Sequence, residues 1–177
     1  GPLGTLHLGL VYAGNTEEAF KYMEQHMRHG HRMLVPFLEK VDPKRVKEGL
    51  DKIVQARFKR VTLFGSLDEA VKADVDMILA FDYKCTISQK PGQDTTVDMT
   101  GTFMNRQERI IDVVKGSGSS TPAYVSFTYG FGLALDAGFE QFTSGLDKSS
   151  ALIVFGERRK LPTASLETGS KSVTTID

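Results

Sequence analysis

The sequence has one cysteine, no tryptophan and a formal net charge of zero. Because Cys85 is alone, no disulfide can form within the chain. Its neighbours place it on the apolar side of an expected strand, where we predict a buried and unreactive thiol. The charge balance supplies no overall positive field, so we predict no nucleic-acid partner. The sequence also lacks an apolar run of the roughly 18 residues that a membrane-spanning helix needs.

Signatures of catalysis are equally scarce. No serine stands in a nucleophile-elbow pattern. Asp74 and Asp76 flank Val75, and paired carboxylates perform acid–base chemistry when they are buried together. We interpret this pair as the solvated beginning of a strand. We therefore predict that the protein is not an enzyme and has no catalytic residues and no cofactor.

Three histidines lie close together at 26, 29 and 31. On a helix, His26 and His29 are three residues apart and could share a metal ion with His31 nearby. A firm site usually needs three or four ligands with ordered partners. We interpret the three as exposed histidines at a helix end and predict no metal centre. A metal-linked binding protein remains an open alternative.

Periodicity predicts the fold class. Between Asp76 and Ser88 every second residue from Met77 to Ile87 is apolar, and the opposite face has polar residues at 82, 84, 86 and 88. This period of two predicts a long strand with one buried face. A polar hairpin follows over 95–115, with its tip at Asn105-Arg106-Gln107. Since the other face is polar, we expect water on it, as antiparallel sheets allow. The prediction is an α+β fold (an α/β sandwich): a mixed, largely antiparallel sheet with helices packed on one face.

Helix starts are marked by capping residues. Asp42-Pro43 places an N-cap before a proline at the first helical position. Ser66 with Glu69 three residues later forms a capping box, which predicts a short helix ending near Ala73. A helix is also expected after Asn15 or Thr16, and short strands are expected over 6–12 and 61–64.

The glycine-serine run at 116–120 is predicted to be the connection between a strand and a helix. Backbone amides of Gly116, Ser117, Gly118 and Ser119 could bind an anion there. The pattern lacks the lysine of the phosphate loop and the third glycine of the dinucleotide fingerprint. A small α/β enzyme that binds a nucleotide or phosphate ligand through Gly116–Ser120 is therefore kept as the alternative function.

The C-terminal third is less regular. Segment 123–146 fits a strand or a helix pattern, and its length and alanine content favour a helix from Phe131 onward. We expect an edge strand over 151–155. The predicted organisation is a single domain over 5–156, followed by a flexible polar tail over 157–177. Residues 1–4, Gly-Pro-Leu-Gly, are typical of an expression-tag remnant, so the native N-terminus is expected to have been removed.

Charge is unevenly distributed along the chain. Residues 21–60 contain eleven basic and five acidic residues, a balance of +6 that the remaining residues offset with −6. The favoured interpretation is the solvated face of surface helices. An anionic partner or a membrane surface is the other interpretation.

The order of elements resembles a group of bacterial envelope lipoproteins. The resemblance runs over roughly 6–146 and is carried by three segments: 61–70 (VTLFGSLDEA), 73–79 (ADVDMIL) and 111–118 (IDVVKGSG). In this order of elements the chain resembles the periplasmic domains of curli-secretion, penicillin-binding-protein-activator and transport-auxiliary lipoproteins. No residue of those families carries over to a specific position here.

The resemblance implies a non-catalytic role in protein–protein interaction or assembly at the outer membrane. Envelope proteins or further copies of the chain are the expected partners. The protein would be periplasmic and outer-membrane anchored, and it would touch the membrane only through a lipid anchor upstream of the present N-terminus.

Overall fold

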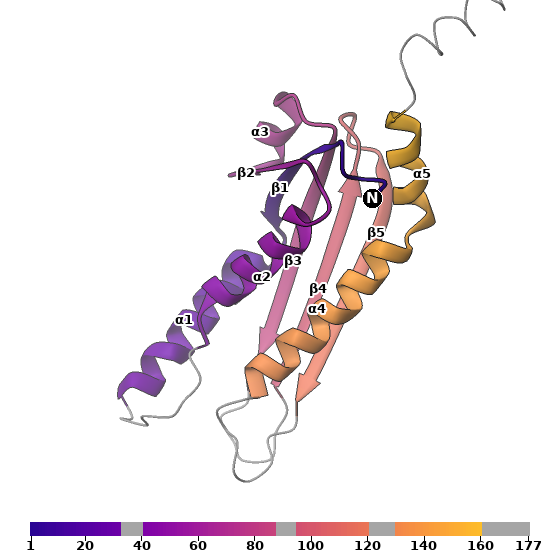
Figure 1. Ribbon diagram of the computed structural model, residues 1–177. Helices are drawn as coiled ribbons and strands as arrows, with labels where there is room; N and C mark the ends of the chain where they lie inside the picture. The colour runs from indigo at the N-terminus through magenta and orange to yellow at the C-terminus, as the bar shows by residue number, and fades with distance from the viewer. Residues whose placement is uncertain (33–40, 88–94, 121–129, 161–177) are drawn as a thin grey trace, which may run out of the picture.

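A computed structural model describes residues 1–32, 41–87, 95–120 and 130–160. The elements follow one another as five strands and five helices within these ranges (Figure 1). Their bounds are β1 His7–Ala13, α1 Thr16–Arg32, α2 Pro43–Gln55, β2 Arg60–Phe64, α3 Leu67–Lys72, β3 Met77–Thr86, β4 Thr95–Met104, β5 Ile110–Ser120, α4 Gly130–Lys148 and α5 Ser150–Arg159.

The strands form one mixed sheet in the order β2-β1-β3-β4-β5. β1 lies parallel to both β2 and β3, and the longer β3, β4 and β5 form an antiparallel meander. Helices α1, α2 and α4 cover one face, with α4 along β5 and β4 (Figure 1). The predicted α+β class with a mixed, largely antiparallel sheet is confirmed.

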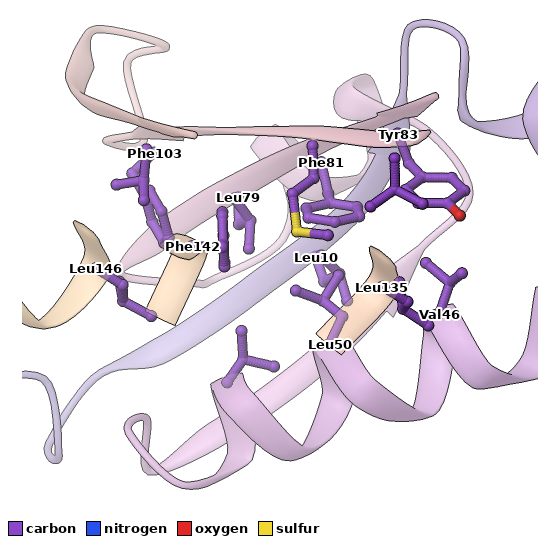
Figure 2. Packing of buried hydrophobic residues seen from close by; sticks show 14 of the residues in the cluster. Leu10, Val46, Leu50, Leu79, Phe81, Tyr83, Phe103, Leu135, Phe142 and Leu146 are labelled. Carbon is purple, nitrogen blue, oxygen red and sulfur yellow. The ribbon is translucent and has the colours of Figure 1, made fainter. Parts of the chain in front are cut away.

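The main core lies between the sheet and these three helices. The apolar positions predicted on β3 are its centre: Phe81 and Tyr83 are fully buried, and Phe142 of α4 packs edge-on against Phe81 with ring centroids 5.6 Å apart (Figure 2). Val46 and Leu50 of α2 close the layer from the helix side. Such interdigitated packing fixes where each helix lies on the sheet.

The second face of the sheet, opposite α1, α2 and α4, is only partly exposed to solvent. Near the beginning of β3, Ile78 is fully buried with Val11 and Met104 against the short helix α3. The expectation of a polar second face therefore holds over β3 from Asp82, over β4 as far as Thr102 and over β5 from Lys115, while α3 covers the corner next to β1 and β2.

The predicted helix caps at Asp42 and Ser66 are confirmed, with one shift at the second. The Asp42 side chain accepts a hydrogen bond from the backbone N–H of Lys44 (2.9 Å). The Ser66 hydroxyl accepts one from the N–H of Glu69 (3.2 Å). The Glu69 carboxylate reaches back to the N–H of Gly65 (3.0 Å), one residue before the cap. At both N-termini, these side chains accept hydrogen bonds from backbone N–H groups that have no partner within the helix.

Side chains of α1 extend the pairing of β3 beyond the end of β1. The buried Thr16 hydroxyl accepts a hydrogen bond from the N–H of Tyr83 (2.9 Å) and lies 2.9 Å from the carbonyl oxygen of Phe81. Six residues later in the same helix, the Tyr22 hydroxyl contacts both the N–H and the carbonyl of Ile87 (3.0 and 2.9 Å). These contacts pair backbone groups that β1 no longer reaches.

The expected connection at 116–120 is wrong, because these residues are the second half of β5. Gly116 pairs with Met99 and Gly118 with Val97 across the ladder. A Cβ on Gly118 would stand 1.8 Å from the carbonyl oxygen of Ala134, and one on Gly116 would stand 2.2 Å from that of Gly138. The glycines are there because α4 lies directly on the strand, and only residues without a Cβ permit that approach.

The expected edge strand at 151–155 is also wrong, because this segment belongs to helix α5. Ser149 caps the helix by accepting a hydrogen bond from the N–H of Leu152 (3.2 Å). Leu152 and Gly156, four residues apart, face inward, and a Cβ on Gly156 would stand 2.1 Å from the carbonyl oxygen of Pro2. The helix continues to Arg159, so the expected tail at 157–177 begins within it, and 161–177 lie outside the described residues.

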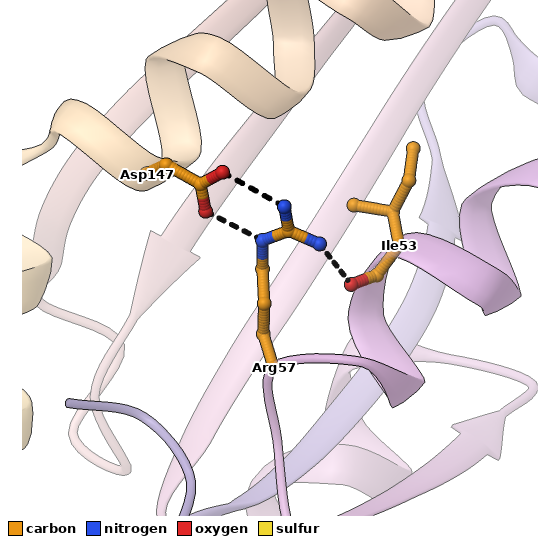
Figure 3. Close-up of polar contacts among 3 residues, drawn as sticks. All are labelled: Ile53, Arg57 and Asp147. Atoms are coloured by element: carbon orange, nitrogen blue, oxygen red, sulfur yellow. Dashed lines mark hydrogen bonds and ion pairs between the residues drawn. The ribbon is translucent and has the colours of Figure 1, made fainter. Parts of the chain in front are cut away.

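The helix expected from Phe131 is confirmed as α4, whereas 121–129 lie outside the described residues. An ion pair ties its last turn to the end of α2 (Figure 3). Arg57 donates to both carboxylate oxygens of Asp147 (2.6 and 2.8 Å) and to the carbonyl of Ile53 (2.8 Å). Bidentate geometry of this kind fixes orientation as well as adding attraction.

Candidate functional site

The four residues proposed for anion binding do not form an anion-binding loop. Gly116 and Gly118 are buried under α4, whereas Ser117 and Ser119 are exposed on the opposite face of the sheet. The backbone of this stretch pairs with β4, and α4 begins only at Gly130. The geometry that the prediction assumed, free amides at the N-terminus of a following helix, is not present at these four positions.

The histidines and acidic residues remain separate. His26 is half-buried in α1 with its ring 6.3 Å from that of Tyr22, and the side chains of His29 and His31 lie outside the described part of the structure. Within the described residues, no three His, Cys, Asp or Glu side chains gather as a metal site would require.

Asp74 and Asp76 each have a separate structural partner. Asp74 pairs with Arg106 at the hairpin tip. Asp76 accepts a hydrogen bond from the N–H of His7 (2.8 Å) and lies 4.0 Å from Arg159. Because each carboxylate is engaged with a different partner, the two do not form an acid–base pair.

Cys85 lies at the end of the core, half-buried beside Tyr83. Burial raises the pKa of the Cys85 thiol to about 11. Burial also raises the pKa of Tyr83, whose fully buried hydroxyl lies beside the Cys85 thiol. Both groups are therefore neutral at physiological pH, which suits the expected unreactive thiol.

The open half of the second face is a mainly polar surface. Cross-strand neighbours there form successive rows: Thr86, Thr96 and Ser119; Lys84, Asp98 and Ser117; Asp82, Thr100 and Lys115. The two lysines and two aspartates balance one another. The turn between β1 and α1 contacts this surface where Asn15 donates its N–H to the Asp82 carboxylate (2.8 Å).

The β5 margin of the sheet is partly closed. The side chain of Gln141 accepts a hydrogen bond from the N–H of Ser117 (3.1 Å), and the Asp112 carboxylate accepts one from the N–H of Val113 (2.8 Å). Helix α5 packs along the same strand near its beginning. Side chains that occupy edge amides in this way hinder another strand from pairing there.

The β2 margin is open. β2 is the last strand on its side of the sheet, and no described element lies beyond it (Figure 1). Its residue Leu63 is 61% exposed although its ladder partner Leu10 is buried in the core. Among the described residues, nothing pairs with the outer backbone of β2. An edge strand with such a backbone and an exposed leucine is a surface on which another chain can add a strand. This margin is the candidate functional site.

Sequence reasoning identified Val61-Thr62-Leu63-Phe64 as a strand but not as an edge. The alternation alone gives no strand order, since β2 pairs with β1, more than 50 residues earlier in the chain. The available signal was the cluster of polar and charged residues on both sides of the segment, from Lys59-Arg60 to Asp68-Glu69.

No family model matches the sequence, and no curated protein matches it. Among solved structures, a dodecamer of a PelC variant from Paraburkholderia phytofirmans is similar over 85% of this chain and 90% of that chain, with a TM-score of 0.46 and 10% identity. Protein XCC0632 from Xanthomonas campestris is similar over 82% and 90%, with a TM-score of 0.44 and 10% identity. The hypothetical protein CT253 from Chlamydia trachomatis is similar over 88% and 95%, with a TM-score of 0.37 and 9% identity.

No helix in the described ranges combines the length and the apolar character that crossing a bilayer requires.

Proposed function

We propose that this chain is a non-catalytic domain of a bacterial envelope lipoprotein that acts by binding envelope proteins or further copies of itself. The observation that carries the proposal is the open β2 margin. Leu63, exposed on an edge strand, is placed to be covered by a partner.

Binding at this margin has a clear physical basis. A strand added to β2 would pair backbone groups along Arg60–Phe64. It would also bury much of Leu63, and full burial of a leucine contributes roughly 1.5–3 kcal/mol. Backbone pairing supplies affinity, while the side chains next to the margin select the partner.

The envelope location is supported by the order of elements. The observed sequence of strand, helices, strand, short helix, long strand, hairpin and C-terminal helices follows the order that carries the resemblance, except that the expected glycine-serine loop is part of β5. A lipid anchor upstream of the present first residue would hold such a domain at the outer membrane.

Two measurements on the natural gene product in its own cells test the proposal. Cell fractionation with metabolic palmitate labelling should place a lipidated protein in the outer membrane. A photo-crosslinking amino acid at Leu63 should yield discrete protein adducts, whereas the same probe at Ser117, exposed on the polar face, should yield few. An unlipidated cytosolic protein would refute the location, and equal adducts at both positions would refute the binding surface.

A further inference from the structure

Charge has a direction along the β2 margin. At the beginning of the strand, Lys59 and Arg60 are exposed, and neither forms an ion pair within the described part of the chain. Beyond its end, Asp68 and Glu69 are exposed in the first turn of α3. The margin therefore begins positive and ends negative, with the apolar side chain of Leu63 between.

We propose that two copies of this chain pair antiparallel through β2, about a two-fold axis centred on Thr62, so that the sheets of both copies join into one. This inference rests on the proposed function in that it names a partner for the same margin. An antiparallel arrangement brings the positive end of each strand to the negative end of its partner, twice in each dimer. A parallel arrangement would place like charges together.

The strand length selects the register. Centring the axis on Thr62 pairs all five residues of β2, with Arg60 opposite Phe64 and Val61 opposite Leu63 of the other copy. Residues opposite each other in an antiparallel pair point to the same face, with Cβ atoms about 4.5–5.5 Å apart. The exposed Leu63 of each copy would thus be covered by Val61 of the other. Centring on Leu63 would leave the first two strand residues unpaired.

Pairing between the two different edge strands, β2 of one copy and β5 of the next, is less favourable than the two-fold β2–β2 contact. Joining β2 of one copy to β5 of the next would require the β5 amides that the side chains of Gln141 and Asp112 already occupy. The two-fold contact uses only the open margin. Because its ion pairs are exposed, we expect the dimer to weaken as salt concentration rises.

Light scattering with size exclusion tests the dimer on the full chain. We expect the dimer fraction to rise with protein concentration, to fall with salt, and to be lost in Leu63→Lys. The matched control is Ile110→Lys, because Ile110 is 64% exposed at the β5 side and its substitution should leave the dimer unchanged. Circular dichroism checks that both variants are folded. A monomer at every concentration, or a dimer that survives Leu63→Lys, would overturn the proposal.

Cysteine crosslinking tests the register. Thr62→Cys should form a covalent dimer under mild oxidation, because the two thiols would face each other across the axis. Val61→Cys and Leu63→Cys should crosslink when mixed but poorly alone, since identical positions would be about 7–8 Å apart. Ser117→Cys and the wild type, with its buried Cys85, serve as controls. Efficient crosslinking of Ser117→Cys instead of Thr62→Cys would contradict the arrangement.

The dimer proposal and the envelope proposal are refuted by different results. A chain that dimerises through β2 but is not lipidated would refute the envelope proposal alone. A lipidated envelope protein whose Leu63 captures only other proteins, and which stays monomeric when purified, would refute the dimer alone.

Discussion

Replacing Gly118 by alanine should strongly destabilise the protein, because helix α4 lies on the strand at this point. The added Cβ would stand 1.8 Å from the carbonyl oxygen of Ala134 and 2.8 Å from the N of Gly138. Both obstacles are backbone atoms, so no side-chain rotation can make room. The helix would have to move outward by more than 1 Å to restore an ordinary contact of 3.4–4 Å.

The size of the effect follows from overpacking. Extra methyl groups in a packed core typically cost about 1–3 kcal/mol, and a backbone obstacle places Gly118→Ala at about 3 kcal/mol or above. For a chain of this size, that corresponds to a fall in Tm of roughly 6–12 °C. Without the clash the sign would reverse, since alanine lowers the entropy of the unfolded chain and stabilises by about 0.4–1 kcal/mol.

Thermal and urea unfolding followed by circular dichroism measure this difference. Ser117→Ala is the matched control, because its side chain is exposed on the opposite face of the same strand. We expect the control to stay within about 0.5 kcal/mol of the wild type. A Gly118→Ala protein as stable as the wild type would refute the close packing of α4 on β5.

Three further predictions concern buried and paired groups. Thr16→Val should destabilise by about 1–3 kcal/mol because the buried N–H of Tyr83 loses its acceptor, and Thr16→Ser should restore most of the loss in urea titrations. Asp147→Asn should cost at most about 1 kcal/mol, since the pair is partly exposed. Hydrogen bonds from Arg57 lower the pKa of Asp147 in the folded protein. The contribution of Asp147 to stability is therefore present above the unfolded pKa of about 3.9 and is lost as pH falls through the lower folded value. The difference in stability between the wild type and Asp147→Asn should close in acid, and a constant difference would contradict this. Cys85, whose pKa burial raises to about 11, should react with a thiol reagent far more slowly in the native protein than after unfolding, and equal rates would show that the thiol is accessible and ionised.

Local patterns in the sequence were sufficient for much of the fold. The alternation along β3 identified its buried face because a strand with one covered face repeats every two residues. Asp42 and Ser66 identified helix starts because each side chain pairs with an amide within three residues of itself. These features depend on neighbours in the sequence, which is why they could be predicted.

The two wrong segments depend on contacts between distant parts of the chain. Gly116 and Gly118 look like loop residues, and only the presence of α4 about 20 residues later explains glycines inside a strand. The run from Ala151 to Phe155 has the composition of a strand, but Ser149 caps it as a helix and Gly156 fits against Pro2. In both segments tertiary packing, rather than the local propensity of the residues, decided the secondary structure.

The candidate site illustrates the same division. The sequence predicted the strand 61–64 but not its place at the margin, since strand order is set by pairing across the whole chain. The proposed anion-binding residues instead proved to be packing and surface positions of β5. Exposure of Leu63 is a property of the assembled sheet, and the charged residues on both sides of the strand only hint at it.

Hydrogen–deuterium exchange at low and high protein concentration tests the central claim, that the β2 margin binds another chain, most directly. If two copies pair through this margin, the amides of residues 60–64 should exchange more slowly in the concentrated sample, while those of β5 should be unchanged. Equal exchange of β2 at both concentrations, or new protection confined to β5, would contradict the account.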